Sequence, residues 1–154
     1  FILVPRLFKD NKISYVCATI GSYIAMLSGL SFLGVGLTPA DLYFHEHVFF
    51  VIVGFRSMVP AMVFLTLAFF FSPVSNKYTV ASVMFLLSIT LYAFFETSDP
   101  PDVSPRENLE LFKESVSYNR MVISVIAQKV ITLISFVSFF VFTYGFYQLS
   151  LLKK

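Results

Sequence analysis

The sequence predicts an all-α membrane protein, a polytopic bundle of four transmembrane helices that forms a single domain over residues 1–154. Two observations predict this fold class. Of the 154 residues, 57% are hydrophobic and 13% are charged, and the mean hydropathy is +0.81. A soluble domain has about 25% charged residues, so the composition indicates lipid as the solvent. In addition, four segments reach the length of about 20 apolar residues with which a helix crosses a bilayer core.

The four predicted spans are 14–37, 48–71, 79–95 and 121–148. Helices are the expected form because backbone groups cannot stay unpaired in hydrocarbon, and the alternation of barrel strands is missing. Lysine and arginine set the orientation, because short cytoplasmic loops carry an excess of them. One side holds six of these residues in short segments, and the other holds three within a long acidic loop. The two sets are Arg6, Lys9, Lys12, Lys77, Lys153 and Lys154 against Arg106, Lys113 and Arg120.

This distribution predicts that both termini are cytoplasmic and that the loops 38–47 and 96–120 face outside. A plasma or inner membrane is expected rather than an organelle membrane. The opening FILVPRL has no basic n-region and no small-residue cleavage site, so it does not read as a signal peptide. We expect it to follow further apolar chain, such as a preceding span.

Two of the spans carry stripes of small or polar residues. In the first span, the small residues fall along one helical face and predict close packing against another helix: Ala18, Ser22, Ala25, Gly29 and Gly36. In the fourth span, a polar stripe is expected to face the bundle interior, with a water-lined path as the alternative: Ser124, Gln128, Thr132, Ser135, Ser138 and Thr143. Cys17 is expected to be a small packing residue.

The outer loop before the fourth span contains a helix start signal. Ser104 is a favourable N-cap, Pro105 suits the first helical position, and Glu107 completes a capping box. These residues predict a capped helix over about 105–117, with Leu109 and Phe112 on its apolar face.

The apolar second span contains a permanent cation, Arg56, and the fourth contains Lys129. Each lies eight residues below the predicted outer end of its span, which is roughly 12 Å at 1.5 Å per residue. A charge at such a depth costs about 2.5–3.5 kcal/mol on insertion scales and normally has a partner. The spans contain no carboxylate at this depth.

Three interpretations of these cations remain open. Their long side chains can carry the charges up to the interface. They can meet a carboxylate from a partner chain or from missing spans. They can also bind an anion such as a lipid phosphate between Arg56 and Lys129, with Gln128 beside them, because a guanidinium suits phosphate or carboxylate. Pro60 cannot donate a hydrogen bond to the carbonyl of Arg56, which indicates a local opening or a kink of the helix.

A second constellation lies in the loop TPADLYFHEH, which holds both histidines of the chain. Asp41, His45 and His47 are suitable ligands for zinc or copper. On a helix, however, His45 and His47 would point about 200° apart, so they could share one ion only in an extended turn. The alternative is a polar cap that starts the second span, with Thr38 or Asp41 as its N-cap. An intramembrane hydrolase using Asp41, His45 and Ser31 is a further alternative.

The stretch GVGLTPADLYFHEHVFF resembles a pattern in six-span membrane proteins related to the DRAM/Frag/Sfk group. The matching residues are Gly34, Gly36, Pro39, Asp41 and either His45 or His47. The resemblance implies that this chain corresponds to the last four of six spans. It also implies an α-helical membrane protein with lipid-related roles.

The sequence therefore predicts a non-enzymatic integral membrane protein, a subunit or scaffold of a larger membrane assembly. The expected partners are the lipid bilayer, a bound lipid, and other membrane subunits or further copies of the chain. A metal-dependent membrane enzyme and a small oligomeric transporter are the alternatives. Nucleic acid is not an expected partner, because the net charge is only +2 and no basic run occurs.

Overall fold

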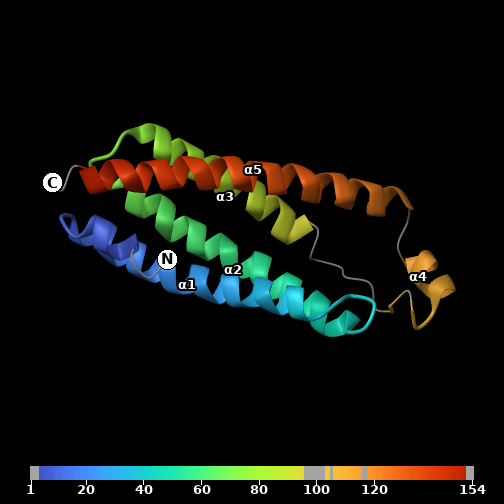
Figure 1. The fold of residues 1–154 in the computed structure, drawn as a ribbon. Coiled ribbons are helices and arrows are strands. Elements are labelled where there is room, and N and C mark those ends of the chain that lie inside the picture. Colours follow the sequence, from blue (N-terminus) through green and yellow to red (C-terminus); the bar gives the residue numbers. More distant parts are fainter. Residues whose placement is uncertain (1–3, 96–102, 105, 116–117, 152–154) are drawn as a thin grey trace.

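The computed structural model describes residues 4–95, 103–104, 106–115 and 118–151. All the regular structure in these residues is helical. Four long helices lie side by side and alternate in direction (Figure 1). The elements in chain order are the 3₁₀ helix η1 (Val4–Phe8), α1 (Lys12–Leu37), α2 (Phe44–Phe70), α3 (Asn76–Phe95), the short α4 (Leu109–Ser115) and α5 (Tyr118–Leu151).

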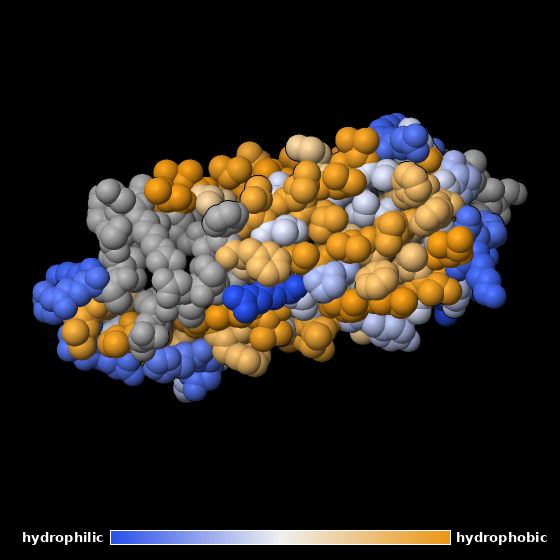
Figure 2. All heavy atoms as spheres, turned by 180° about the vertical axis from the view of Figure 1, so that it is seen from behind, coloured by the Kyte–Doolittle hydropathy of each residue, from blue (hydrophilic) through white to orange (hydrophobic). Residues whose placement is uncertain are grey.

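The bundle has two ends, named here for the short helices that lie there (Figure 1). The η1 end contains η1, the start of α1, the turn between α2 and α3, and the end of α5. The α4 end contains the turn between α1 and α2 together with α4. Figure 2 shows hydrophilic residues gathered at both ends and a mostly hydrophobic surface between them.

Among the described residues, three helices are long and apolar enough to cross a membrane: α1, α2 and α3 over Asn76–Phe94. They match the first three predicted spans, and each helix begins two to four residues before the predicted span. The fourth predicted span lies within α5, which is helical over 34 residues, or roughly 50 Å at 1.5 Å per residue. The apolar segment found in α5 is the shorter Ile126–Ser138, so a fourth crossing stays a prediction.

A seam of small residues joins α1 to α2, the most extensive helix pair in the described chain. Buried residues of α1 recur at spacings of four and three: Ser14, Ala18, Gly21, Ala25 and Ser28. On α2 the same spacing gives Gly54, Met58, Ala61, Leu65 and Ala68, of which all but Met58 are buried. This heptad spacing is typical of helices that cross at about +20° and wind around each other to the left.

The backbones approach closely along the seam because no side chain separates them at Gly21. A Cβ atom added there would lie 3.1 Å from the carbonyl oxygen of Ala61 and 3.0 Å from Cγ of Leu65. The hydroxyl of Ser28 donates a buried hydrogen bond of 2.8 Å to the carbonyl oxygen of Gly54 on the facing helix. Small residues thus supply close packing, and one of them supplies an interhelical hydrogen bond.

The structure corrects the predicted small face of α1 in its second half. Ala18, Ser22 and Ala25 are buried as expected, but Gly29 and Gly36 are exposed, and an added Cβ would meet nothing within 4 Å at either. The buried line continues instead through Ser28, Ser31 and Gly34. The predicted face follows spacings of 4, 3, 4 and 7, whereas the buried residues from Ala25 to Gly34 recur every third residue, so the buried line moves around α1 away from Gly29 and Gly36.

Asn11 ties the start of α1 to the end of α2. Its side-chain oxygen accepts hydrogen bonds from the amides of Ile13 (2.9 Å) and Ser14 (3.1 Å), so it is the N-cap of α1. Its Nδ2 donates to the carbonyl oxygen of Phe71 at 2.9 Å, and Phe71 is the C-cap of α2. The expectation that Thr38 or Asp41 caps α2 is wrong, because the N-cap is Tyr43 and makes no side-chain hydrogen bond.

The remaining contacts are made by larger side chains. The hydroxyls of Thr66 on α2 and Ser82 on α3 share a buried hydrogen bond of 2.7 Å. At the η1 end, Phe8 inserts among the long helices and packs edge-on against Phe69 of α2 and Phe146 of α5, with ring centroids 5.6 and 6.3 Å apart. The core there combines η1 with all four long helices: Phe8, Ala18, Ala68, Phe69, Val74, Tyr78 and Leu149.

Candidate functional site

Arg56 lies on an exposed face of α2, within its apolar length. It is two residues beyond Gly54, and therefore about 200° around the helix from the seam with α1. Helix α2 runs uninterrupted through Pro60, so the predicted opening of the chain is not a break in the helix. The guanidinium group is therefore carried on the side of α2 that faces away from α1.

Lys129 and Gln128 are both exposed on α5. Lys129 precedes the buried Ser138 by nine residues, which is two and a half helical turns, so the two residues lie on opposite faces. The buried Gly145 lies on nearly the same face as Ser138 and contacts Tyr78 of α3. Lys129 thus points away from the neighbouring helices of its own chain.

The arginine and the lysine lie at about the same level of the bundle. Phe55, next to the arginine, packs against Tyr92 of α3 with ring centroids 4.5 Å apart. Seven residues earlier, on nearly the same face of α3, Phe85 belongs to a cluster against which Ile134 of α5 packs. Because α3 and α5 run in opposite directions, the level of Tyr92 corresponds to a point on α5 within two residues of Lys129. The two cations therefore share a level but project from outward faces of different helices, and they do not converge on one pocket.

The predicted polar stripe of α5 is only partly internal. Ser138 is buried as expected, whereas Gln128 and Thr132 are exposed, which corrects the prediction for these two residues. The hydroxyl of Thr132 donates to the carbonyl oxygen of Gln128 at 2.7 Å, so its polar group is paired within its own helix. The side chains of Ser124, Ser135 and Thr143 lie outside the described ones.

The two histidines of the second constellation lie in the first turn of α2 and have different environments. Nδ1 of His47 is 2.6 Å from the carbonyl oxygen of Thr38 and donates to it, since a carbonyl can only accept. This hydrogen bond leaves Nε2 as the acceptor of the neutral ring. His45 is exposed and its ring lies edge-on to that of Phe44. Their helical placement turns the two imidazoles about 200° apart.

Asp41 lies in the turn that precedes α2 and is exposed. Among the residues that the structure describes, no group of three His, Cys, Asp or Glu side chains is placed to hold a metal ion. The zinc or copper site at Asp41, His45 and His47 therefore gains no support and stays a prediction.

Ser104, Arg106 and Glu107 of the outer loop lie at this same end, and Arg106 docks on the turn before α2. Nη1 of Arg106 donates to the backbone carbonyl of Asp41 at 3.1 Å. Ser104 and Glu107 exchange hydrogen bonds of 3.1 Å, each from a backbone amide to the other's side chain. These bonds, chiefly that from the backbone N–H of Ser104, lower the pKa of Glu107 from its ordinary value, with a smaller attraction from His45.

The expected helix over about 105–117 is shorter in the structure. The Ser104–Glu107 exchange closes a turn, and α4 begins only at Leu109, where Asn108 accepts a hydrogen bond of 3.1 Å from the amide of Leu111. Residues 105, 116 and 117 lie outside the described ones.

Comparison of the chain with known protein families, with curated proteins and with solved structures finds no match. The resemblance to the DRAM/Frag/Sfk group is therefore untested.

Proposed function

We propose that the chain is a non-enzymatic integral membrane protein, a subunit or scaffold whose outward-facing cations, Arg56 and Lys129, each contact an anionic group in the membrane. That group is a lipid phosphate or a carboxylate of a partner subunit. In this proposal α5 is the fourth span, and the two cations lie at one level in the outer half of the bilayer.

The apolar surface supports a membrane environment. Only 22% of the 18-residue apolar segment of α2 is buried within the chain, and for α1 and α3 the shares are 33% and 39%. Large apolar side chains such as Leu30, Phe49 and Phe140 are more than half exposed. Soluble monomers rarely expose contiguous apolar patches above a few hundred Å².

The charges at the two ends support the proposed orientation. Among the described residues, the η1 end carries four cations against one carboxylate, and the α4 end, counted with the first turn of α5, carries three cations against five carboxylates. The residues are Arg6, Lys9, Lys12, Lys77 and Asp10 at the η1 end, and Arg106, Lys113, Arg120, Asp41, Glu46, Glu107, Glu110 and Glu114 at the α4 end. With the positive end inside, both termini lie on the cytoplasmic side of a plasma or inner membrane.

The observation that carries the proposal is the exposure of Arg56 on the outward face of an apolar helix. Lipid disfavours an ionised group at that depth, and a guanidinium offers a planar fork of donors that matches phosphate or carboxylate. A hydrogen bond to a charged group contributes about 1.5–3 kcal/mol. Such a contact would offset much of the cost of placing the arginine there.

The test compares Arg56→Leu and Lys129→Leu with Lys113→Leu, which removes an exposed cation from α4. The wild-type chain and the three variants are purified in mild detergent with phosphatidylglycerol, and bound lipid and partner subunits are counted by native mass spectrometry. We expect Arg56→Leu to weaken lipid or partner retention by about tenfold or more, and Lys113→Leu to leave it unchanged. Unchanged retention in both Arg56→Leu and Lys129→Leu would show that these side chains only extend to the interface.

A further inference from the structure

We infer that the η1 end holds a second anion site, in which Lys77, Tyr144 and Tyr147 bind the phosphate of an anionic phospholipid from the cytoplasmic leaflet. This inference rests on the proposed function, because it requires the bundle to lie in a bilayer. It concerns the opposite end of the bundle from Arg56 and Lys129.

The ammonium group of Lys77 is positioned by aromatic rings from two helices. Its Nζ lies 5.1 Å from the centroid of the Tyr78 ring on α3 and 5.9 Å from that of Tyr144 on α5. Both distances are within the range of a cation–π contact. Lys77 itself is exposed, so its charge is held in place while remaining accessible to a ligand.

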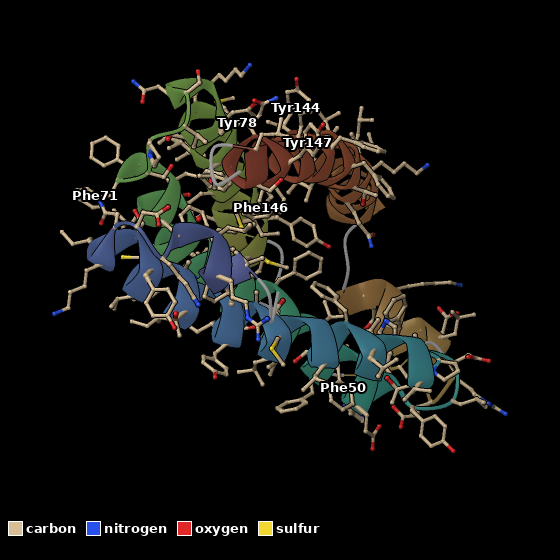
Figure 3. All side chains as sticks on the ribbon, turned by 60° about the vertical axis from the view of Figure 1, so that its left-hand side comes forward. Phe50, Phe71, Tyr78, Tyr144, Phe146 and Tyr147 are labelled. Atoms are coloured by element: carbon tan, nitrogen blue, oxygen red, sulfur yellow. The ribbon has the colours of Figure 1, made fainter. Side chains whose placement is uncertain are left out.

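Three tyrosines extend this arrangement outward from the core (Figure 3). Tyr78 is buried at 3% exposure, whereas Tyr144 and Tyr147 are 52% and 55% exposed. The ring centroids are 6.3 Å apart from Tyr78 to Tyr144 and 6.2 Å apart from Tyr144 to Tyr147. The buried ring has room because α5 presents Gly145 to it, where an added Cβ would lie 3.0 Å from Tyr78.

An apolar track leads from this group along α3 and α5 toward the middle of the bundle. On α3, Val80 and Met84 follow Lys77 at helical spacing and are exposed. On α5, Phe140 and Val137 precede Tyr144 at spacings of four and three and are also exposed. A ligand bound here would meet a cation and phenol groups at one end and apolar side chains beyond them. A phospholipid has this distribution of phosphate and acyl chain, whereas a free phosphate or an acidic peptide does not.

Charge complementarity favours an anionic lipid in particular. Four of the five described charged side chains near this end are cations: Arg6, Lys9, Lys12 and Lys77, against Asp10. Anionic lipids of the cytoplasmic leaflet attract basic groups near the membrane surface by about 1 kcal/mol for each lysine or arginine. Tyrosine is enriched at this depth, where its ring lies among headgroups and its hydroxyl meets water.

The test compares Lys77→Gln with Lys12→Gln, which removes one exposed cation from the same end without a contact to the tyrosines. The full chain is placed in nanodiscs or detergent with phosphatidylglycerol or phosphatidylcholine, and retained lipid is counted by native mass spectrometry. We expect Lys77→Gln to lower phosphatidylglycerol retention about fivefold, since one lysine contributes about 1 kcal/mol. Lys12→Gln should lower it less than half as much, and Tyr147→Phe should show a smaller loss in the same direction.

Equal losses in Lys77→Gln and Lys12→Gln would overturn the site in favour of diffuse attraction. Displacement of the lipid by excess inorganic phosphate would show that the group takes free phosphate instead. Retention that depends on Arg56 but not on Lys77 would overturn this inference and leave the proposed function standing. Release of the wild-type chain from membranes by alkaline carbonate would overturn the proposed function itself.

Discussion

The α1–α2 pair and the α3–α5 pair are both antiparallel, but they are held together differently. Between α1 and α2 the contact residues are mostly Gly, Ala and Ser, and at Gly21 the facing atoms include a backbone carbonyl. Where α3 meets α5, the contacts are made by tyrosine and phenylalanine rings, as at Tyr78 and Gly145. The first pair relies on close approach of backbones, and the second on large side chains.

In the proposed membrane environment, the two kinds of contact contribute differently to stability. In lipid, burying an apolar side chain between helices gains little, because acyl chains are equally apolar, so packing and hydrogen bonds must hold helices together. The α1–α2 seam provides both, through its small residues and the Ser28–Gly54 hydrogen bond. At one end of the α3–α5 contact, Phe8 of η1 packs in the same cluster as Tyr78 and Leu149.

The largest expected effect is that of filling the seam. Gly21→Leu places a branched side chain against the Ala61 carbonyl, which belongs to the facing backbone and cannot rotate away. We expect a loss of about 3 kcal/mol in the free energy of unfolding, at the upper end for overpacking. Gly29→Leu is the matched control, since a Cβ there meets nothing within 4 Å. Unfolding curves in detergent, monitored by circular dichroism, measure the free energy of unfolding of both variants. Equal losses would show that the backbones of α1 and α2 do not approach closely at Gly21.

A smaller effect is expected from the hydrogen bond across the seam. Ser28→Ala removes the 2.8 Å bond to Gly54, and such bonds within membranes average about 0.6 kcal/mol. Ser31→Ala removes a hydroxyl bonded to Leu27 of the same helix, so it should cost less than Ser28→Ala. The same unfolding curves measure both variants. A greater loss for Ser31→Ala would mean that the interhelical bond does not hold the pair.

The smallest effect is expected in the aromatic contact. At Gly145 an added Cβ meets only ring atoms of Tyr78 and Phe69, at 3.0–3.3 Å, and rings can shift slightly. Replacing glycine by alanine within a helix gains about 1 kcal/mol of propensity, which offsets this crowding. Gly145→Ala should therefore change the unfolding free energy by less than about 0.5 kcal/mol, whereas Gly21→Ala should be clearly destabilising. If the two variants behave alike in thermal melts, the distinction between the helix pairs is wrong.

The candidate site could be predicted from the sequence only in part. The positions of Arg56 and Lys129 along their helices follow from counting residues along the chain, and the helices place them at about one level. Counting residues does not show how far one helix is rotated about its own axis relative to another helix. The structure places both cations on exposed faces of different helices rather than at one shared pocket.

The sequence by itself determined where the long helices lie, because apolar length and flanking charge are local properties of the chain. It also contained the signals for two local hydrogen-bonded caps. Asn11 was not predicted as the N-cap of α1, and the capping box of Ser104 and Glu107 was predicted to start a longer helix than the structure shows. Only the tertiary structure decided which face of α1 is buried and that Arg106 docks on the turn before α2. Each depends on a partner distant in sequence: Ser28, rather than Gly29, meets Gly54 of α2, and Arg106 reaches the carbonyl of Asp41 across 65 residues.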